Sequence, residues 1–145
     1  MKKSLIFKKI LFIGFLSTNI FAMEQIEESI IEKCISENSG EAGVFCLESL
    51  YNKGKDLIKK KESNIRILLQ KKHESDDLGD VHYESAIKNL DESSKIFKSY
   101  SNKLCNFNAY SAGGVASGFN IVYFSCLIEQ NNFRIKILNR ALFYK

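Results

Sequence analysis

The sequence has 145 residues with 21 basic and 17 acidic side chains, and its formal net charge is +4. Four of the basic residues, Lys2, Lys3, Lys8 and Lys9, lie in the first 22 positions, which hold no acidic side chain, so the rest of the chain is formally neutral. A neutral chain gives no support for a nucleic-acid partner, because affinity for phosphates requires clustered Lys and Arg.

The N-terminal segment has the pattern of a secretory signal peptide. Basic residues precede an apolar run from Ile10 to Leu16, and a short polar patch then leads to Ala22. The run is shorter than the ~20 residues that a spanning helix needs. We therefore expect residues 1–22 to be a cleaved leader, 23–145 to be one domain in the periplasm or outside the cell, and no stable membrane insertion after cleavage. The alternative is an uncleaved N-terminal anchor.

The four cysteines form an even set in a chain predicted to be exported. They are Cys34, Cys46, Cys105 and Cys126. Disulfides are typical of exported proteins of this size, whereas a structural zinc site usually takes ligands from closely spaced pairs. Pairing by proximity predicts Cys34 with Cys46 and Cys105 with Cys126, although four cysteines allow three connectivities.

Apolar residues at steps of three and four predict four helical segments and an all-α bundle. The first ends before Gly40, a left-handed C-cap, and the second extends over about 42–72. A polar turn over 73–80 leads to the third segment, 83–105. Residues 106–117 are expected to form a loop, and a last helical stripe includes Phe133 and Ile137 and continues to the C-terminus.

Particular positions sharpen this prediction. Ile26 and Ile30 are expected on the buried stripe of the first helix, and Phe97 and Tyr100 against the last helix. Gly54 weakens its helix by about 1 kcal/mol relative to alanine, which indicates either a close approach of another backbone or a bend. The basic run 59–61 is expected to be a solvated face, with a patch for polyanions or membranes as the alternative.

Motifs for catalysis or cofactor binding are not apparent. His73 and His82 flank an acidic turn, but the spacing does not fit a calcium loop. The glycines near Gly113 do not have the spacing of a phosphate-binding loop, and the sequence has no nucleophile elbow. A pair of facing carboxylates remains conceivable among the many Asp and Glu residues. We expect no enzyme, no metal site and no cofactor.

Parts of the third and fourth segments resemble the exported LprI-type lysozyme inhibitors, which have a four-cysteine helical domain. The family pattern has a Leu and a Gln, a Trp followed by Tyr-Arg, a cysteine, a Gly-Gly loop, a second cysteine and a final Arg and Leu. The matching residues are Leu90, Phe97, Tyr100, Cys105, Gly113, Gly114, Cys126, Arg134 and Leu138.

The chain also departs from that pattern. Phe97 stands for the Trp, Ser94 for the Gln, Ser101 for the Arg and Asn131 for a Thr. Such changes keep the core shape and weaken the expectation of the same surface chemistry. The resemblance implies the helical fold and a lysozyme or other cell-wall hydrolase as the partner.

An acidic first helix suits the inhibitor hypothesis, since lysozymes are typically basic. Residues 24–48 hold seven acidic side chains and one basic one. The candidate contacts there are Glu24, Glu27 and Glu28. Acidic residues are also ordinary partners of a helix N-terminus.

The competing hypothesis is a non-inhibitory interaction module of the periplasm or exterior. Its candidate contacts are aromatic residues near the glycine loop: Phe107, Tyr110, Phe119 and Phe124. A third class, an enzyme acting on the cell wall, would require two convergent carboxylates in a cleft.

Overall fold

The computed structural model describes residues 26–38 and 40–141. Within these ranges the chain is entirely helical apart from its turns, with α1 (Glu28–Glu37), α2 (Glu41–Glu74), α3 (Asp80–Ala112) and α4 (Ala116–Ala141). The predicted all-α bundle of about four helices is confirmed. The leader assigned to 1–22 and the candidate contact Glu24 lie outside the described residues.

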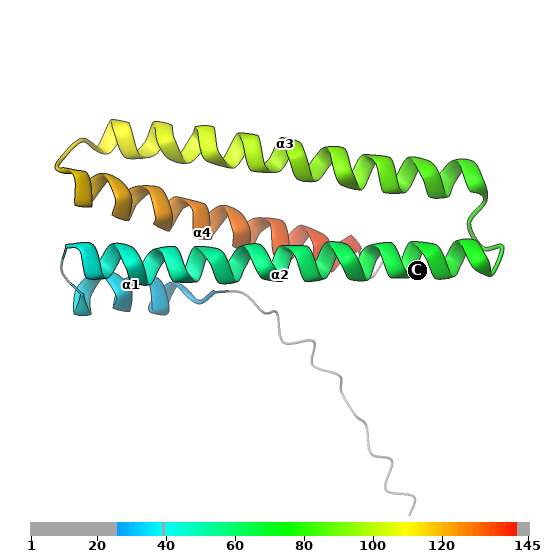
Figure 1. Ribbon diagram of the computed structural model, residues 1–145, viewed down its shortest axis with the longest axis horizontal. Coiled ribbons are helices and arrows are strands. Elements are labelled where there is room, and N and C mark those ends of the chain that lie inside the picture. The colour runs from blue at the N-terminus through cyan, green and yellow to red at the C-terminus, as the bar shows by residue number, and fades with distance from the viewer. Residues whose placement is uncertain (1–25, 39, 142–145) are drawn as a thin grey trace, which may run out of the picture.

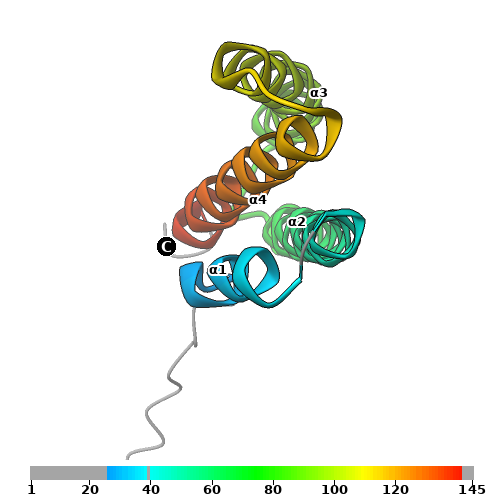
Figure 2. The same cartoon turned by 90° about the vertical axis from the view of Figure 1, so that its left-hand side faces the viewer.

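The helices form an elongated bundle (Figure 1). The helices α2 and α3 make a long hairpin, and α4 runs back along it but ends before the 75–79 turn. Seen end-on, α4 lies between α3 on one side and the α1 and α2 pair on the other (Figure 2). The turns between α1 and α2 and between α3 and α4 therefore lie at the same end of the molecule.

Two disulfides hold that end, which we call the stapled end. Cys34 bonds Cys46 and Cys105 bonds Cys126, with Cα–Cα distances of 5.6 and 5.5 Å. The predicted pairing is confirmed, and the described residues contain no free cysteine. Disulfides persist in oxidising compartments, so the pair fits a protein of the periplasm or the cell exterior.

Apolar side chains fill the bundle in three clusters. At the stapled end, Leu47 and Ile128 are fully buried between α1, α2 and α4. Cys105 and Leu127 form a second cluster beside them, and Tyr51 packs against both. Further along, Ile135 of α4 packs between α2 and α3 with the members Ile58, Ile65, Leu90 and Leu138.

Several predicted boundaries and faces are wrong. The loop expected over 106–117 is confined to 113–115, because Cys105 and Ala109 are buried against α4 and keep α3 helical. Ile30 is exposed although Ile26 and Ile31 are buried. On α4, Phe133 and Ile137 point to solvent, and polar Asn131 and Arg134 occupy the buried face instead.

Glycines at the turns have positive φ, as expected for Gly40, but Gly40 is the N-cap of α2 and the C-cap of α1 is Asn38. Gly40 has φ +59° between α1 and α2, and Gly113 and Gly114 have φ +67° and +99° between α3 and α4. These left-handed values are costly for residues with a Cβ. None of the helices in the described part of the chain is both long and apolar enough to cross a membrane.

Candidate functional site

An uncovered aromatic face runs along α3 near the stapled end. Tyr100, Phe107 and Tyr110 are 57%, 67% and 75% exposed. Their steps of seven and three residues place them on one side of the helix, away from Ser101, Cys105 and Ala109, which are buried. We call these three residues the aromatic face. Tyr100 was expected to be buried against the last helix, and that prediction is wrong.

The aromatic face is anchored through a chain of rings that leads into the core. Tyr110 contacts Phe119 of α4 edge-on at 4.8 Å between ring centroids, and Phe119 stacks on Tyr123 at 6.1 Å. Tyr123 and Phe124 are 5.4 Å apart, and Phe124 is 6.0 Å from Tyr51. Phe119 and Phe124, expected among the exposed aromatics, are half-buried. Their rings fix Tyr110 in place.

Burial also affects the chemistry of Tyr51 inside this ring chain. Loss of hydration, with a smaller contribution from nearby Tyr123, raises the pKa of the Tyr51 hydroxyl above its usual range. The neutral phenol is therefore favoured at every physiological pH.

The acidic residues of α1 lie on a different side of the molecule. Glu27 and Glu28 are exposed, as are the other acidic side chains of this region within the described residues: Glu32, Glu37, Glu41 and Glu48. The nearest cation on α1 is Lys33, whose Nζ is 3.8 Å from Glu37 in a solvent-exposed pair. Figure 2 shows α4 between α1 and α3. The acidic helix and the aromatic face are thus separate surfaces.

Arg134, one of the residues on which the predicted resemblance rests, is buried among α2, α3 and α4. Its guanidinium donates to Glu62 Oε1 and to Ser93 Oγ, both at 3.0 Å. The ring of Phe97 lies 5.6 Å from the guanidinium carbon. Phe97 is half-buried and packs on the cluster containing Leu90 and Leu138. Arg134 is buried, and its bonds hold α2, α3 and α4 together.

Gly54 marks a close approach, but of a side chain and not of a backbone. Its buried Cα faces Asn131 of α4, and an added Cβ would lie 2.7 Å from Asn131 Nδ2. The same amide donates to the Tyr51 carbonyl at 3.2 Å. The sequence predicted either another backbone close to Gly54 or a bend, and the neighbour found there is instead a side chain of α4.

The side chains at the turn between α2 and α3 contact one another and are not arranged as metal ligands. His73 stacks on Tyr83 at 4.6 Å, and its Nδ1 is 3.1 Å from the Leu78 carbonyl oxygen. Its Nε2 is 3.7 Å from Asp80, while His82 is exposed. Across residues 26–38 and 40–141, no group of three or more His, Cys, Asp or Glu is placed to hold a metal ion.

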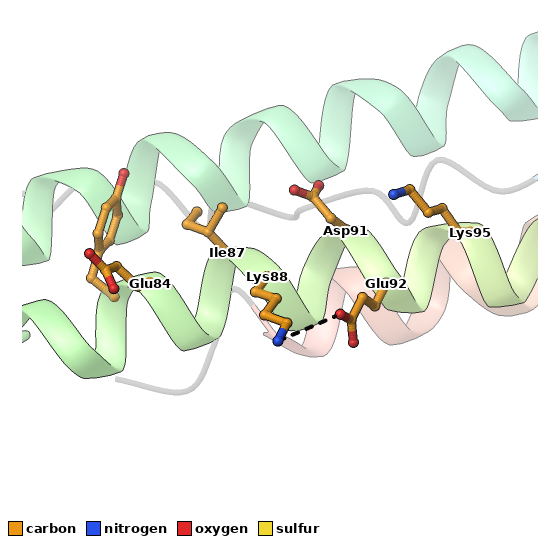
Figure 3. A pocket seen from close by; sticks show the side chains of 7 residues that line it. Glu84, Ile87, Lys88, Asp91, Glu92 and Lys95 are labelled. Atoms are coloured by element: carbon orange, nitrogen blue, oxygen red, sulfur yellow. Dashed lines mark ion pairs between the residues drawn. The ribbon is translucent and has the colours of Figure 1, made fainter.

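A hollow along α3 carries no convergent chemistry either. Its lining comes from this one helix, and Figure 3 shows Lys88 and Glu92 meeting along the surface, with Nζ and Oε1 4.0 Å apart. Asp91 is bonded to Arg66 of α2. Lys88, Asp91 and Glu92 are therefore already paired, and a single helix cannot enclose a ligand.

A groove between α2 and α3 was missed by the sequence analysis. Lys55 and Lys59 of α2 and Lys98 of α3 line it, over a floor contributed partly by α4. The basic run 59–61 was expected to be a solvated face, and Lys59 and Lys60 are exposed, whereas Lys61 is only 8% exposed. Residues 59 and 98 are far apart in sequence, so only the pairing of the helices could have brought them together.

Comparisons with protein-family models, with curated proteins and with solved structures found no match to this chain.

Proposed function

We propose that this chain is an exported protein-binding module that docks a partner on the aromatic face of α3. The observation that carries the proposal is the exposure of Tyr100, Phe107 and Tyr110 on one side of a helix whose opposite side is tied to the core. Exposed aromatic side chains gathered on one side of a helix are typical of a binding surface.

The size of the patch suits a binding surface. A Tyr or Phe side chain buries roughly 200 Å², so three rings exposed by more than half present on the order of 400 Å². That area equals the largest apolar patch of a typical monomer, which is often functional. Tyrosine is also enriched among the residues that dominate interface energetics.

The rigidity of the patch adds to its suitability. Cys105 lies between Tyr100 and Phe107 in sequence and is bonded to Cys126 of α4. Tyr110 is held by Phe119. A surface that is ordered before binding loses less conformational entropy on association.

A lysozyme or other cell-wall hydrolase is the first partner to test. The resemblance to LprI-type inhibitors supports this choice, and the exposed acidic side chains of α1 supply negative potential towards a basic partner. Inhibition would follow if the docked bundle covered the catalytic cleft.

The decisive experiment measures binding of the oxidised protein to purified lysozymes of several structural classes. Tyr100→Ser, Phe107→Ser and Tyr110→Ser together should weaken binding at least ~30-fold, the effect of losing one strong hot spot. The matched control replaces exposed apolar residues elsewhere, Ile67→Ser and Val81→Ser, and should change affinity less than ~3-fold. Equal losses in both variants would contradict the proposal.

The contribution of α1 can be measured separately. Glu27→Lys with Glu28→Lys should slow association with a basic lysozyme and reduce the salt dependence of the rate, because encounter between exposed charges is screened as the Debye length falls from ~10 Å at 0.1 M to ~3 Å at 1 M. Absence of binding to every lysozyme at low salt would reject these enzymes as partners.

A further inference from the structure

A groove between α2 and α3, floored in part by α4, has the composition of a ligand site. Its cavity measures about 180 Å³. Ile58 of α2, Phe97 of α3 and Leu127 of α4 supply apolar surface, and the buried members Ile58 and Leu127 belong to the core. The groove faces away from Tyr100 and Phe107, which do not line it.

The charged side chains around the groove that have no ion-pair partner among the described residues are all basic. Lys55, Lys59 and Lys98 stand on its two walls and are exposed. Lys55 Nζ lies 4.8 Å from the centroid of the Tyr51 ring, which places one ammonium group over the groove wall. The one acidic residue of the lining, Glu62, is neutralised by Arg134 at 3.0 Å.

An unsatisfied hydroxyl points to the same conclusion. Ser101 lines the groove, is 4% exposed, and its Oγ has no hydrogen-bond partner among the described residues. A buried hydroxyl without a partner is unfavourable and calls for an explanation. An oxygen atom of a ligand would accept its hydrogen bond.

The volume limits the ligand. A cavity of ~150 Å³ lined by apolar side chains accommodates benzene. The cavity in the groove therefore matches one ring and a few further atoms in size.

We propose that this groove binds a small organic anion with a ring-sized apolar body, of the aryl carboxylate class. The ring would lie against Ile58, Phe97 and Leu127, and the carboxylate would face the lysines and the Ser101 hydroxyl. This site is independent of the aromatic face, so either can exist without the other.

The test titrates the oxidised protein with three probes that share one body and differ in charge: 3-phenylpropanoate, 3-phenylpropan-1-ol and 3-phenylpropylamine. Two-dimensional amide NMR gives affinity and location together. The anion should bind at least ten-fold more tightly than the alcohol, the amine should not bind, and shifts should centre on 55–59 and 97–102. Similar affinity for all three probes, or shifts centred elsewhere, would overturn the proposal.

Variants separate the site from general attraction to a basic surface. Lys55→Met, Lys59→Met and Lys98→Met together keep the apolar stems of exposed residues and should remove the preference for the anion. The matched control, Lys53→Met, Lys95→Met and Lys103→Met, removes the same charge from positions that do not line the groove and should leave it intact. An equal loss of the preference for the anion in both sets of variants would mean nonspecific attraction to basic residues and would refute binding in the groove.

Ser101→Ala tests the site with a variant that is expected to fold as stably as the original protein. Removing an unsatisfied hydroxyl should not lower the melting temperature of the protein. It should weaken the binding of 3-phenylpropanoate several-fold and change the weaker binding of the alcohol less. Unchanged affinity for the anion would exclude the role assigned to Ser101.

Discussion

The two ends of the bundle are made from the same helices and are held in different ways. At the stapled end, two disulfides and a chain of aromatic rings join four helices. At the other end, which we call the hairpin tip (residues 66–89), α2 and α3 are the only described helices that continue past the end of α4 (Figure 1). At the base of the tip Arg66 pairs with Asp91, and within the tip His73 stacks on Tyr83.

The difference shows what a third helix contributes. None of residues 66–89 is buried, whereas every helix at the stapled end has buried residues. Two helices side by side leave most of each surface in water, so they gain little from apolar burial. Local stability should therefore fall from the stapled end to the hairpin tip.

The largest expected effect comes from removing one staple. Cys105→Ala with Cys126→Ala opens a link between residues 21 positions apart and should lower the free energy of unfolding by about 3 to 4 kcal/mol in denaturant melts. A loss below about 1 kcal/mol would mean that the packing around Leu127 holds this end without the bond.

The next effect concerns the ion pair that joins the middle of the bundle. Arg134→Met should destabilise by about 2 to 3 kcal/mol, because Glu62 would keep its charge in a largely buried place without a partner. Adding Glu62→Gln should recover part of that loss. If the double variant is no more stable than the single one, the unpaired charge is not the cause.

Two glycine substitutions should change the stability of the protein by smaller amounts and in opposite directions. Gly54→Ala should destabilise by about 1 to 2 kcal/mol despite the better helix propensity of alanine, since its Cβ would meet the Asn131 amide at 2.7 Å. Gly118→Ala meets nothing within 4 Å and should stabilise by about 0.5 kcal/mol. Thermal melts of both variants give the comparison, and equal shifts would contradict the close packing at Gly54.

The smallest effect belongs to the ion pair at the base of the hairpin tip. Asp91→Asn removes an ion pair whose side chains are 39% and 46% exposed, and the global free energy of unfolding should change by less than about 1 kcal/mol. Urea melts would measure it. A larger loss would show that the tip depends on this pair as the other end depends on its disulfides.

The helices and the cysteine pairing were predictable because both depend on local spacing. Apolar residues at helical steps define the helices, and Cys34 with Cys46 and Cys105 with Cys126 each join neighbouring segments across one turn. The exception at 106–117 arose because Gly113 and Gly114 suggested a loop, while buried Cys105 and Ala109 extend the helix almost to the glycines.

The faces of the helices were less predictable, since they depend on which neighbours are present. Tyr100 fits the heptad-like spacing of α3, but this helix has no neighbour on its outer side among the described residues, and the buried stripe is narrower than the spacing suggests. Arg134 and Asn131 can be buried because each donates a hydrogen bond to α2, Arg134 to Glu62 and Asn131 to the Tyr51 carbonyl. Sequence alone does not specify such partners on another helix.

Native-state amide hydrogen exchange tests most directly the claim that the stapled end is a rigid platform and the hairpin tip is not. The account predicts that amides of residues 101–109 exchange only through global unfolding, and that amides of residues 70–88 exchange through local opening at a free energy at least ~2 kcal/mol lower. Equal protection of the two segments, or stronger protection at the tip, would contradict it.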